Sequence, residues 1–231
     1  MSRIGLFITC INDALYPQTP KAVVAVLERL GYEVDFPQDQ TCCGQMHANS
    51  GYRKDAVRLA KSFDRVFGAY DAVVTPSGSC AAMAREQYPA LIGGDIGERV
   101  YELSEFLLDH AGVEDVGARF PHTVAYHPTC HGTRVLGLGD KPLRLLRAVE
   151  GIELIDLPEA DQCCGFGGTF ALKNAEVSSA MLDDKRRHAA GTGAEYLAAA
   201  DNSCLTHIGG GLSRAGGPEP IHYAEILAST E

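Results

Sequence analysis

The chain has 231 residues, 45% of them hydrophobic and 22% charged, and a net charge of −10. This composition is typical of a globular protein and excludes disordered and collagen-like chains, while the lack of a basic stripe argues against nucleic acid as a partner. No apolar run reaches the roughly 18–20 residues of a membrane helix, and no secretory core follows the N-terminus, so we expect no membrane insertion and a cytoplasmic location.

The predicted elements of the first half alternate between strands and helices. The apolar run 4–8 predicts a buried strand. Thr19-Pro20 predicts a helix start, and the apolar face that follows ends at Gly31. A second helix is expected over 53–67 and a second buried strand over 71–76. Strands and helices in alternation predict a parallel sheet with right-handed crossovers.

The second half repeats these features about 120 residues later. Four pairs of segments match: FITC (7–10) with HPTC (127–130), LGYEVDFPQDQTCCG with VEGIELIDLPEADQCCG, SGSCAAM (77–83) with DNSCLTH (201–207), and YELSEFLLD with HYAEILAST. A period this long indicates a duplicated domain-sized unit. We therefore predict an α/β fold of two pseudo-symmetric repeats, 1–116 and 117–231, joined within 113–121. Each repeat is expected to be a Rossmann-like, three-layer unit with a parallel sheet.

Cysteines stand at matching places in both halves. They are Cys10, Cys42, Cys43 and Cys80, then Cys130, Cys163, Cys164 and Cys204. Each follows the end of a predicted strand, and the carboxyl ends of parallel strands form the edge at which open α/β sheets bind ligands. We therefore expect residues that are far apart in the sequence to converge at this edge.

Several roles are open to these thiols. They could be small buried hydrophobic residues, but that role requires neither a repeated register nor positions at strand ends. Disulfides are disfavoured in a reducing compartment, and adjacent cysteines pair poorly with each other. One zinc ion per half suits four thiolates, although neighbouring side chains in an extended segment diverge and fit one small ion awkwardly.

An iron–sulfur cluster fits the spacing better than a single ion. Two adjacent thiolates can bind different iron atoms of one cluster, and clusters are commonly held by four thiolates. Gly44 and Gly165 follow the two Cys-Cys pairs, where a residue without a side chain lets the backbone approach a bulky group. The eight cysteines thus predict two clusters, one per half, with zinc as the alternative.

Other signals are weaker. The glycines of 165–168 and 209–211 do not form a dinucleotide fingerprint, and we expect them to let the backbone pass close to a cluster. His131 and His207 are candidate ligands that could replace a thiolate. His127 is interpreted as structural, and the charged residues of 176–187 as a solvated helix face.

These motifs resemble a known family. The stretches that carry the resemblance are LFITCINDALYP, EVDFPQDQTCCGQ, NSGY, TPSGSCAAM, DQCCGFGGTFALK and CLTHIGGGL. They are similar to the cysteine-rich CCG iron–sulfur proteins, which include the B subunit of heterodisulfide reductase, and most of all to the lactate utilization protein A family. The resemblance covers essentially the full length.

One departure from the wider pattern concerns its final Cys-x-x-Cys. Met83 and His207 stand where the second of those cysteines is expected, so each half has four cysteines where the reductase subunit uses five for a noncubane cluster. An ordinary [4Fe–4S] cluster, one per half, remains open.

The family resemblance implies a function in lactate metabolism. It implies an electron-relaying component of L-lactate oxidation to pyruvate, working with other iron–sulfur proteins of a lactate-utilization system. A thiol–disulfide oxidoreductase and a zinc-stabilised, non-enzymatic partner-binding module are the alternatives.

Overall fold

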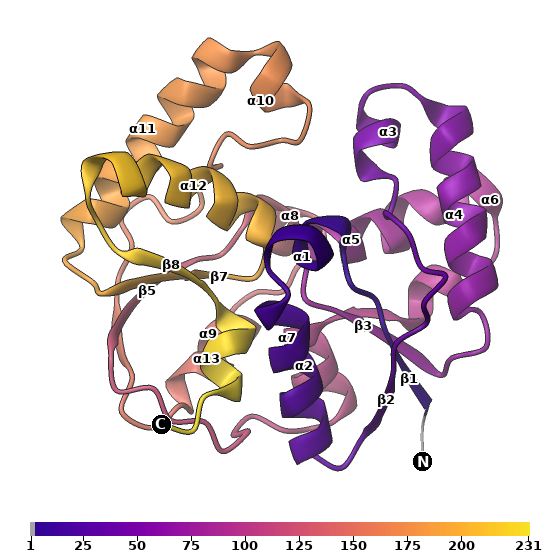
Figure 1. Ribbon diagram of the computed structural model, residues 1–231, viewed down its shortest axis with the longest axis horizontal. Helices are drawn as coiled ribbons and strands as arrows, with labels where there is room; N and C mark the ends of the chain where they lie inside the picture. The colour runs from indigo at the N-terminus through magenta and orange to yellow at the C-terminus, as the bar shows by residue number, and fades with distance from the viewer. Residues whose placement is uncertain (1–2) are drawn as a thin grey trace.

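The computed structural model describes residues 3–231, and two parallel four-stranded sheets are found there, one in each half of the chain (Figure 1). Residues 1 and 2, with which the predicted first repeat begins, lie outside the described part. The first sheet contains β1 (Arg3–Leu6), β2 (Glu33–Asp35), β3 (Ala72–Thr75) and β4 (Val100–Glu102). The second contains β5 (Thr123–His127), β6 (Glu153–Ile155), β7 (Tyr196–Ala199) and β8 (Glu219–His222). The strand orders, β2-β1-β3-β4 and β6-β5-β7-β8, are equivalent, which confirms the α/β class with two repeated parallel-sheet units.

Helices connect the strands in both halves. The first half has α1 (Cys10–Leu15), α2 (Gln18–Arg29), α3 (Gln45–Asn49), α4 (Arg53–Phe67), α5 (Gly78–Ala82), α6 (Tyr88–Ile92) and α7 (Leu103–Glu105), with single π-helical turns over Met83–Gln87 and Phe106–His110 and a 3₁₀ turn over Ile96–Arg99. The second half has α8 (Cys130–Arg134), α9 (Lys141–Arg147), α10 (Phe170–Lys173), α11 (Ala175–Gly191), α12 (Asn202–Ala215) and α13 (Tyr223–Ala228).

Helix α2 begins earlier than the sequence predicts. Pro17, whose φ of −64° is already helical, precedes its first residue, Gln18. Thr19 is therefore inside the helix, and its buried hydroxyl donates a hydrogen bond to Glu225 in the second half instead of capping α2. The predicted apolar face is correct, and Gly31 follows the helix with a φ of +85°.

The two repeats share a central layer of helices. Helices α2, α7, α9 and α13 lie between the two sheets, while α4 and α6 cover the outer face of the first sheet and α11 and α12 that of the second (Figure 1). Val26 and Leu103 from the first half and Leu145 and Leu227 from the second belong to one buried cluster. The two units therefore pack against each other through these helices, and burying this common layer stabilises both.

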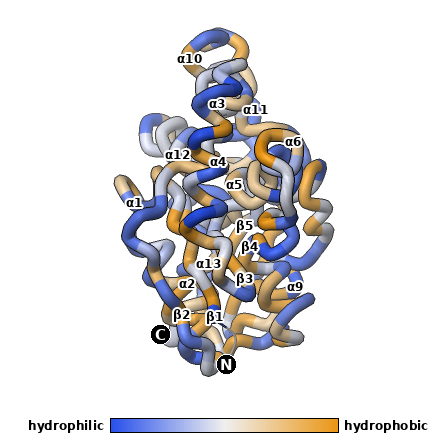
Figure 2. Tube along the Cα trace, turned by 90° about the vertical axis from the view of Figure 1, so that its right-hand side faces the viewer, coloured by the Kyte–Doolittle hydropathy of each residue, from blue (hydrophilic) through white to orange (hydrophobic). Residues whose placement is uncertain are grey.

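The strands carry apolar side chains on both faces. In β3 every residue is buried; Ala72 and Val74 face the central cluster, whereas Val73 faces the outer cluster under α4. Figure 2 shows hydrophobic colour along much of the chain in the interior, where the strands lie. Burial on both faces is typical of parallel sheets, and it leaves the strand ends as the place for polar and reactive side chains.

The segment after the first sheet is tied to the second half. Arg119 forms isolated β-bridges with Glu150 and Thr230, and the Arg29 guanidinium donates hydrogen bonds to the carbonyls of Val116, Leu227 and Ala228. The boundary between residues 116 and 117 stays a prediction. Within residues 3–231, no helix is long and apolar enough to cross a membrane.

Candidate metal centre

One cavity between the two halves is lined by cysteines from both. Its walls also include hydroxyl-bearing residues, Gly167 and Gly168, and Asp201. The cysteines in its wall are Cys10, Cys42, Cys43, Cys80, Cys130, Cys163, Cys164 and Cys204. The structure thus brings together all the cysteines singled out from the sequence, at the carboxyl ends of the strands.

Four of these cysteines lie in the first turn of a helix. Cys10 and Cys130 are the first residues of α1 and α8, while Cys80 and Cys204 lie in the first turns of α5 and α12. Backbone N–H groups that lack a helical partner point outward from a helix start and favour negative charge on nearby sulfur. This placement helps to offset the charge that four thiolates would carry in each half.

The remaining cysteines lie in two equivalent Cys-Cys-Gly turns. Gly44 and Gly165 have φ angles of +84° and +90°, which a residue with a side chain rarely adopts. In this conformation the N–H of Gly44 donates to Cys42 Sγ and the N–H of Gly165 donates to Cys163 Sγ, each over 3.4 Å. Each glycine thereby turns the chain so that an amide stabilises a sulfur.

We call Cys10, Cys42, Cys43 and Cys80 the first quartet. Cys10 Sγ lies 4.0 Å from Cys42 Sγ. Hydrogen bonds from the thiols of Cys10 and Cys43 lower the pKa of Cys42 to about 2, and the same bonds with burial raise the pKa of both donors. One thiolate therefore sits among thiols that a metal would deprotonate on binding.

Cys130, Cys163, Cys164 and Cys204 form the second quartet, which repeats this pattern. Hydrogen bonds from Cys130 and Cys164 lower the pKa of Cys163 to about 2 and, with burial, raise the pKa of the two donors. Within residues 3–231 every cysteine is a free thiol. The donor set fits a thiolate-held metal or iron–sulfur cluster in each half, since four sulfurs and a sulfur-directed amide converge in both places.

Asp201 joins the two quartets. It is 2% exposed, and its Oδ2 accepts from the Ser79 N–H (2.9 Å) and the Ser77 hydroxyl at the start of α5. Its Oδ1 accepts from the Ser203 N–H (3.0 Å) at the start of α12. One carboxylate thus caps the helices that carry Cys80 and Cys204.

The two candidate histidine ligands have different surroundings. His131 lines the cavity, with Nδ1 3.8 Å from Cys130 Sγ and Nε2 3.0 Å from the Gln45 amide nitrogen. His207 is absent from the cavity wall, and its Nε2 lies 3.3 Å from the Ser178 hydroxyl. His131 is thus the better placed of the two.

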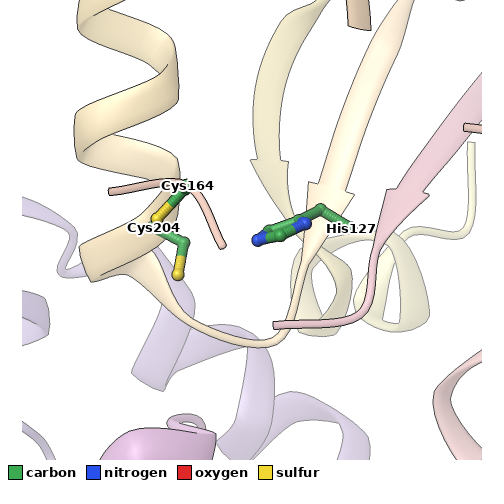
Figure 3. A group of neighbouring side chains, drawn as sticks. All are labelled: His127, Cys164 and Cys204. Carbon is green, nitrogen blue, oxygen red and sulfur yellow. The ribbon is translucent and has the colours of Figure 1, made fainter. Parts of the chain in front are cut away.

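Two polar residues near the second quartet were not among the predicted ligands. His127, interpreted from the sequence as structural, ends β5 with its ring directed toward Cys164 and Cys204 (Figure 3). Burial lowers its pKa to about 4, so the ring is neutral. Lys185, expected on a solvated face, is fully buried. The sequence carried one signal for both residues: the matching positions of the first repeat, Phe7 and Phe63, are aromatic.

The two glycine-rich stretches have different roles. Gly167 and Gly168 lie in the cavity wall, in line with the expected close approach of the backbone to a bound group. The expectation is wrong for 209–211, which is part of α12. A side chain at Gly209 would meet Pro220 of β8, and one at Gly211 would meet Leu182 of α11, so these glycines serve helix packing.

Similarity to known proteins identifies the family of the chain. The model of the cysteine-rich domain CCG matches residues 4–85 and 124–209, one match in each repeat. Lactate utilization protein A of Geobacillus thermodenitrificans is 49% identical, with 97% of this chain and 98% of that protein covered. The protein of the same name from Oceanobacillus iheyensis is 45% identical, with 97% and 96% covered. The chain belongs to the lactate utilization protein A family of CCG proteins.

A likeness to solved structures is more distant. Glutamate racemase from Francisella tularensis in complex with D-glutamate is 12% identical, with a TM-score of 0.38 over 98% of this chain and 78% of that chain.

Proposed function

We propose that the chain is an iron–sulfur redox component of L-lactate oxidation to pyruvate, relaying electrons through clusters held by its cysteines. The observation that carries the proposal is the convergence of two equivalent quartets of free thiols on one cavity. Relatives at 42–49% identity that are named lactate utilization proteins support the link to lactate. By this proposal, the cysteines of each quartet are the cluster ligands.

The residues of the chain would bind and tune the clusters. Clusters, when bound, supply one-electron chemistry, and lactate oxidation releases two electrons. Cys43, Cys80, Cys164 and Cys204 are at most 8% exposed, so they hold the inner side of each site away from water. The amides of Gly44 and Gly165 donate to sulfur, and hydrogen bonds of this kind tune cluster potentials.

The sharing of one cavity suggests a route for electrons. The cysteines of both quartets line the same cavity, so clusters held by them would be neighbours. Two such sites could pass on both electrons from one lactate. We propose that the donor and acceptor are other iron–sulfur proteins of a lactate-utilization system and that the chain acts in the cytoplasm.

Metal and sulfide analysis tests the proposal. Protein purified without oxygen should be brown and contain about four irons and about four acid-labile sulfides per half, with an EPR signal on reduction. Zinc at one per half, without sulfide or a redox signal, would instead establish the zinc-stabilised module. Protein that stays colourless after anaerobic reconstitution would overturn the proposal.

Growth on lactate tests the physiological part. Deletion of the gene should block growth on L-lactate but not on pyruvate, and the wild-type chain should restore it. Cys43→Ser and Cys164→Ser should fail to restore growth although the proteins accumulate, while Lys61→Ala, an exposed position, should succeed. Normal growth of the deletion strain on lactate would argue against a role in lactate oxidation.

A further inference from the structure

The two quartets differ in the residues behind them. Phe7 and His127 each stand three residues before the first cysteine of a quartet. Phe7 directly follows β1, and His127 is the last residue of the equivalent strand β5. Phe7 is fully buried and packs edge-on against Phe63, with ring centroids 4.9 Å apart. His127 is 1% exposed, so an imidazole takes the place of a phenyl ring in the second half.

The helix residue behind Phe7 in the first half also differs from the one behind His127 in the second. A side chain on Gly44 would contact Leu59 of α4, and one on Gly165 would contact Met181 of α11. Leu59 and Met181 are therefore equivalent positions of the two repeats, and α4 corresponds to α11. Four residues further along, Phe63 of α4 corresponds to Lys185 of α11. A pair of aromatic rings behind the first quartet is thus replaced by a histidine and a lysine behind the second.

The side chain of Lys185 is hydrogen-bonded to the loop before the second Cys-Cys pair. It is fully buried, and its Nζ donates to the Glu159 carbonyl (2.6 Å) and the Ala160 carbonyl (3.3 Å). The lysine therefore anchors the loop that leads to Cys163 and makes no hydrogen bond to His127. Its positive charge nearby also disfavours a second cation on the imidazole.

His127 has no hydrogen-bond partner of its own in the part of the chain that the structure describes. Neither ring nitrogen makes one, although the backbone of Ala160 lies close enough to influence the ring. A ring nitrogen, Cys164 Sγ and Cys204 Sγ all lie within 4.8 Å of one another, and all three residues are buried (Figure 3). A buried polar group without a partner is costly, so its presence beside two thiols points to a ligand.

We propose that His127 is a metal ligand of the second quartet, which makes the chain the carrier of two different centres. The first centre would be held by thiolates alone, because Phe7 offers no donor atom. The second would have an imidazole in addition to its thiolates, and both are established ligands of iron. This inference rests on the proposed function, which supplies the iron.

Nitrogen hyperfine spectroscopy tests this assignment on the full-length chain. Protein labelled with ¹⁵N-histidine and reconstituted anaerobically with iron and sulfide should show, on reduction, the coupling of a directly bound nitrogen at one of its two centres. The coupling should disappear in His127→Phe, which copies the first half, and in the smaller-volume variant His127→Gln. It should persist in His131→Gln and His207→Gln, and the first centre should keep its signal throughout.

The outcomes separate the two proposals. Clusters without a directly bound nitrogen, a coupling as weak as a hydrogen bond gives, or a coupling that survives both His127 variants would overturn the ligand assignment and leave the proposed function intact. If no cluster is incorporated, the proposed function fails, and Co²⁺ then tests His127 in the same chains. A Co²⁺ ligand-field spectrum that changes in His127→Phe and His127→Gln supports ligation, whereas an unchanged spectrum overturns it.

Discussion

Each quartet contains one cysteine that is stabilised as a thiolate by its neighbours. In the first quartet that residue is Cys42, which receives hydrogen bonds from two thiols and from the Gly44 amide. A thiolate, not a thiol, is the metal ligand, so Cys42 is ready for a metal before the other members. Binding would then deprotonate the rest, and the free energy of metal binding would add to that of folding.

We therefore expect Cys42→Ser to weaken the first centre and the fold together. The variant should lose the iron of the first half, about half of the total, and melt several degrees lower than the wild type, since a structural metal contributes folding free energy. Iron analysis and thermal unfolding under anaerobic conditions measure both effects. Lys61→Ala, at an exposed position, is the control and should match the wild type. Unchanged iron content and melting temperature in Cys42→Ser would contradict the prediction.

At the scale of elements, the two Cys-Cys-Gly turns are alike in backbone but not in surroundings. A side chain on Gly44 would meet the flexible Leu59 at 3.3 Å, whereas one on Gly165 would meet the Ser178 carbonyl at 2.7 Å. A side chain of α4 can shift, but a backbone carbonyl within the 17-residue helix α11 cannot move as easily. The second turn is therefore packed more closely against its helix.

This difference predicts unequal effects of one substitution. Gly44→Ala should cost about 1–2 kcal/mol of unfolding free energy, the penalty for a side chain at positive φ. Gly165→Ala carries the same penalty and a backbone clash, and should cost clearly more, on the order of 3 kcal/mol. Chemical unfolding of both variants in the same metal state measures the difference. Equal losses would show that α11 yields as readily as the Leu59 side chain.

The elements also show why the sequence predicted some features and not others. The strands β1 and β3 were predictable as short apolar runs, and the register of the repeat placed every cysteine at a strand end. The places of His127 and Lys185 beside the second quartet were not predictable, because the sequence does not show which helix face packs behind a sheet. Their position follows from the alignment of α11 with β5, which only the packing of the second half defines. The sequence does not identify which helices form the shared central layer, since each helix face is apolar whether one sheet or two cover it.

At the scale of the whole molecule, Asp201 is a polar link between the halves at the cavity. It accepts two hydrogen bonds from the start of α5 in one repeat and two from the start of α12 in its own. In Asp201→Asn, the side-chain NH₂ group would face N–H and hydroxyl groups that are themselves hydrogen-bond donors. We expect this substitution to lower the free energy of unfolding by about 2–4 kcal/mol. Chemical unfolding tests this against Asp140→Asn, at a helix start where the side chain makes no capping hydrogen bond. Equal stability of the two variants would mean that the link is dispensable.

A buried carboxyl group joins the halves at the central layer. Glu102 ends β4 and is fully buried, and the Tyr223 hydroxyl of the second half donates to its Oε1 over 2.6 Å. Burial raises the pKa of Glu102 to about 7, although the hydrogen bonds from Ser104 and Tyr223 act in the opposite direction. The folded chain therefore holds a proton here that the unfolded chain, with a carboxyl pKa near 4.5, has released.

The sign of the resulting pH dependence follows from this difference. Between pH 4.5 and about 7 the folded state binds more protons at Glu102 than the unfolded state does, so the contribution of this group to stability is complete below pH 4.5 and is lost as the pH rises through 7. Glu102→Gln mimics the neutral acid and removes the dependence. The unfolding free energy of the wild type relative to Glu102→Gln should therefore fall from pH 4.5 to pH 8, by on the order of 3 kcal/mol. Urea unfolding in the same metal state measures it, with exposed Glu98→Gln as the control whose curve stays parallel to the wild type. A difference that does not change with pH would show that Glu102 is ionised in the folded protein, with its charge stabilised across the junction by Tyr223.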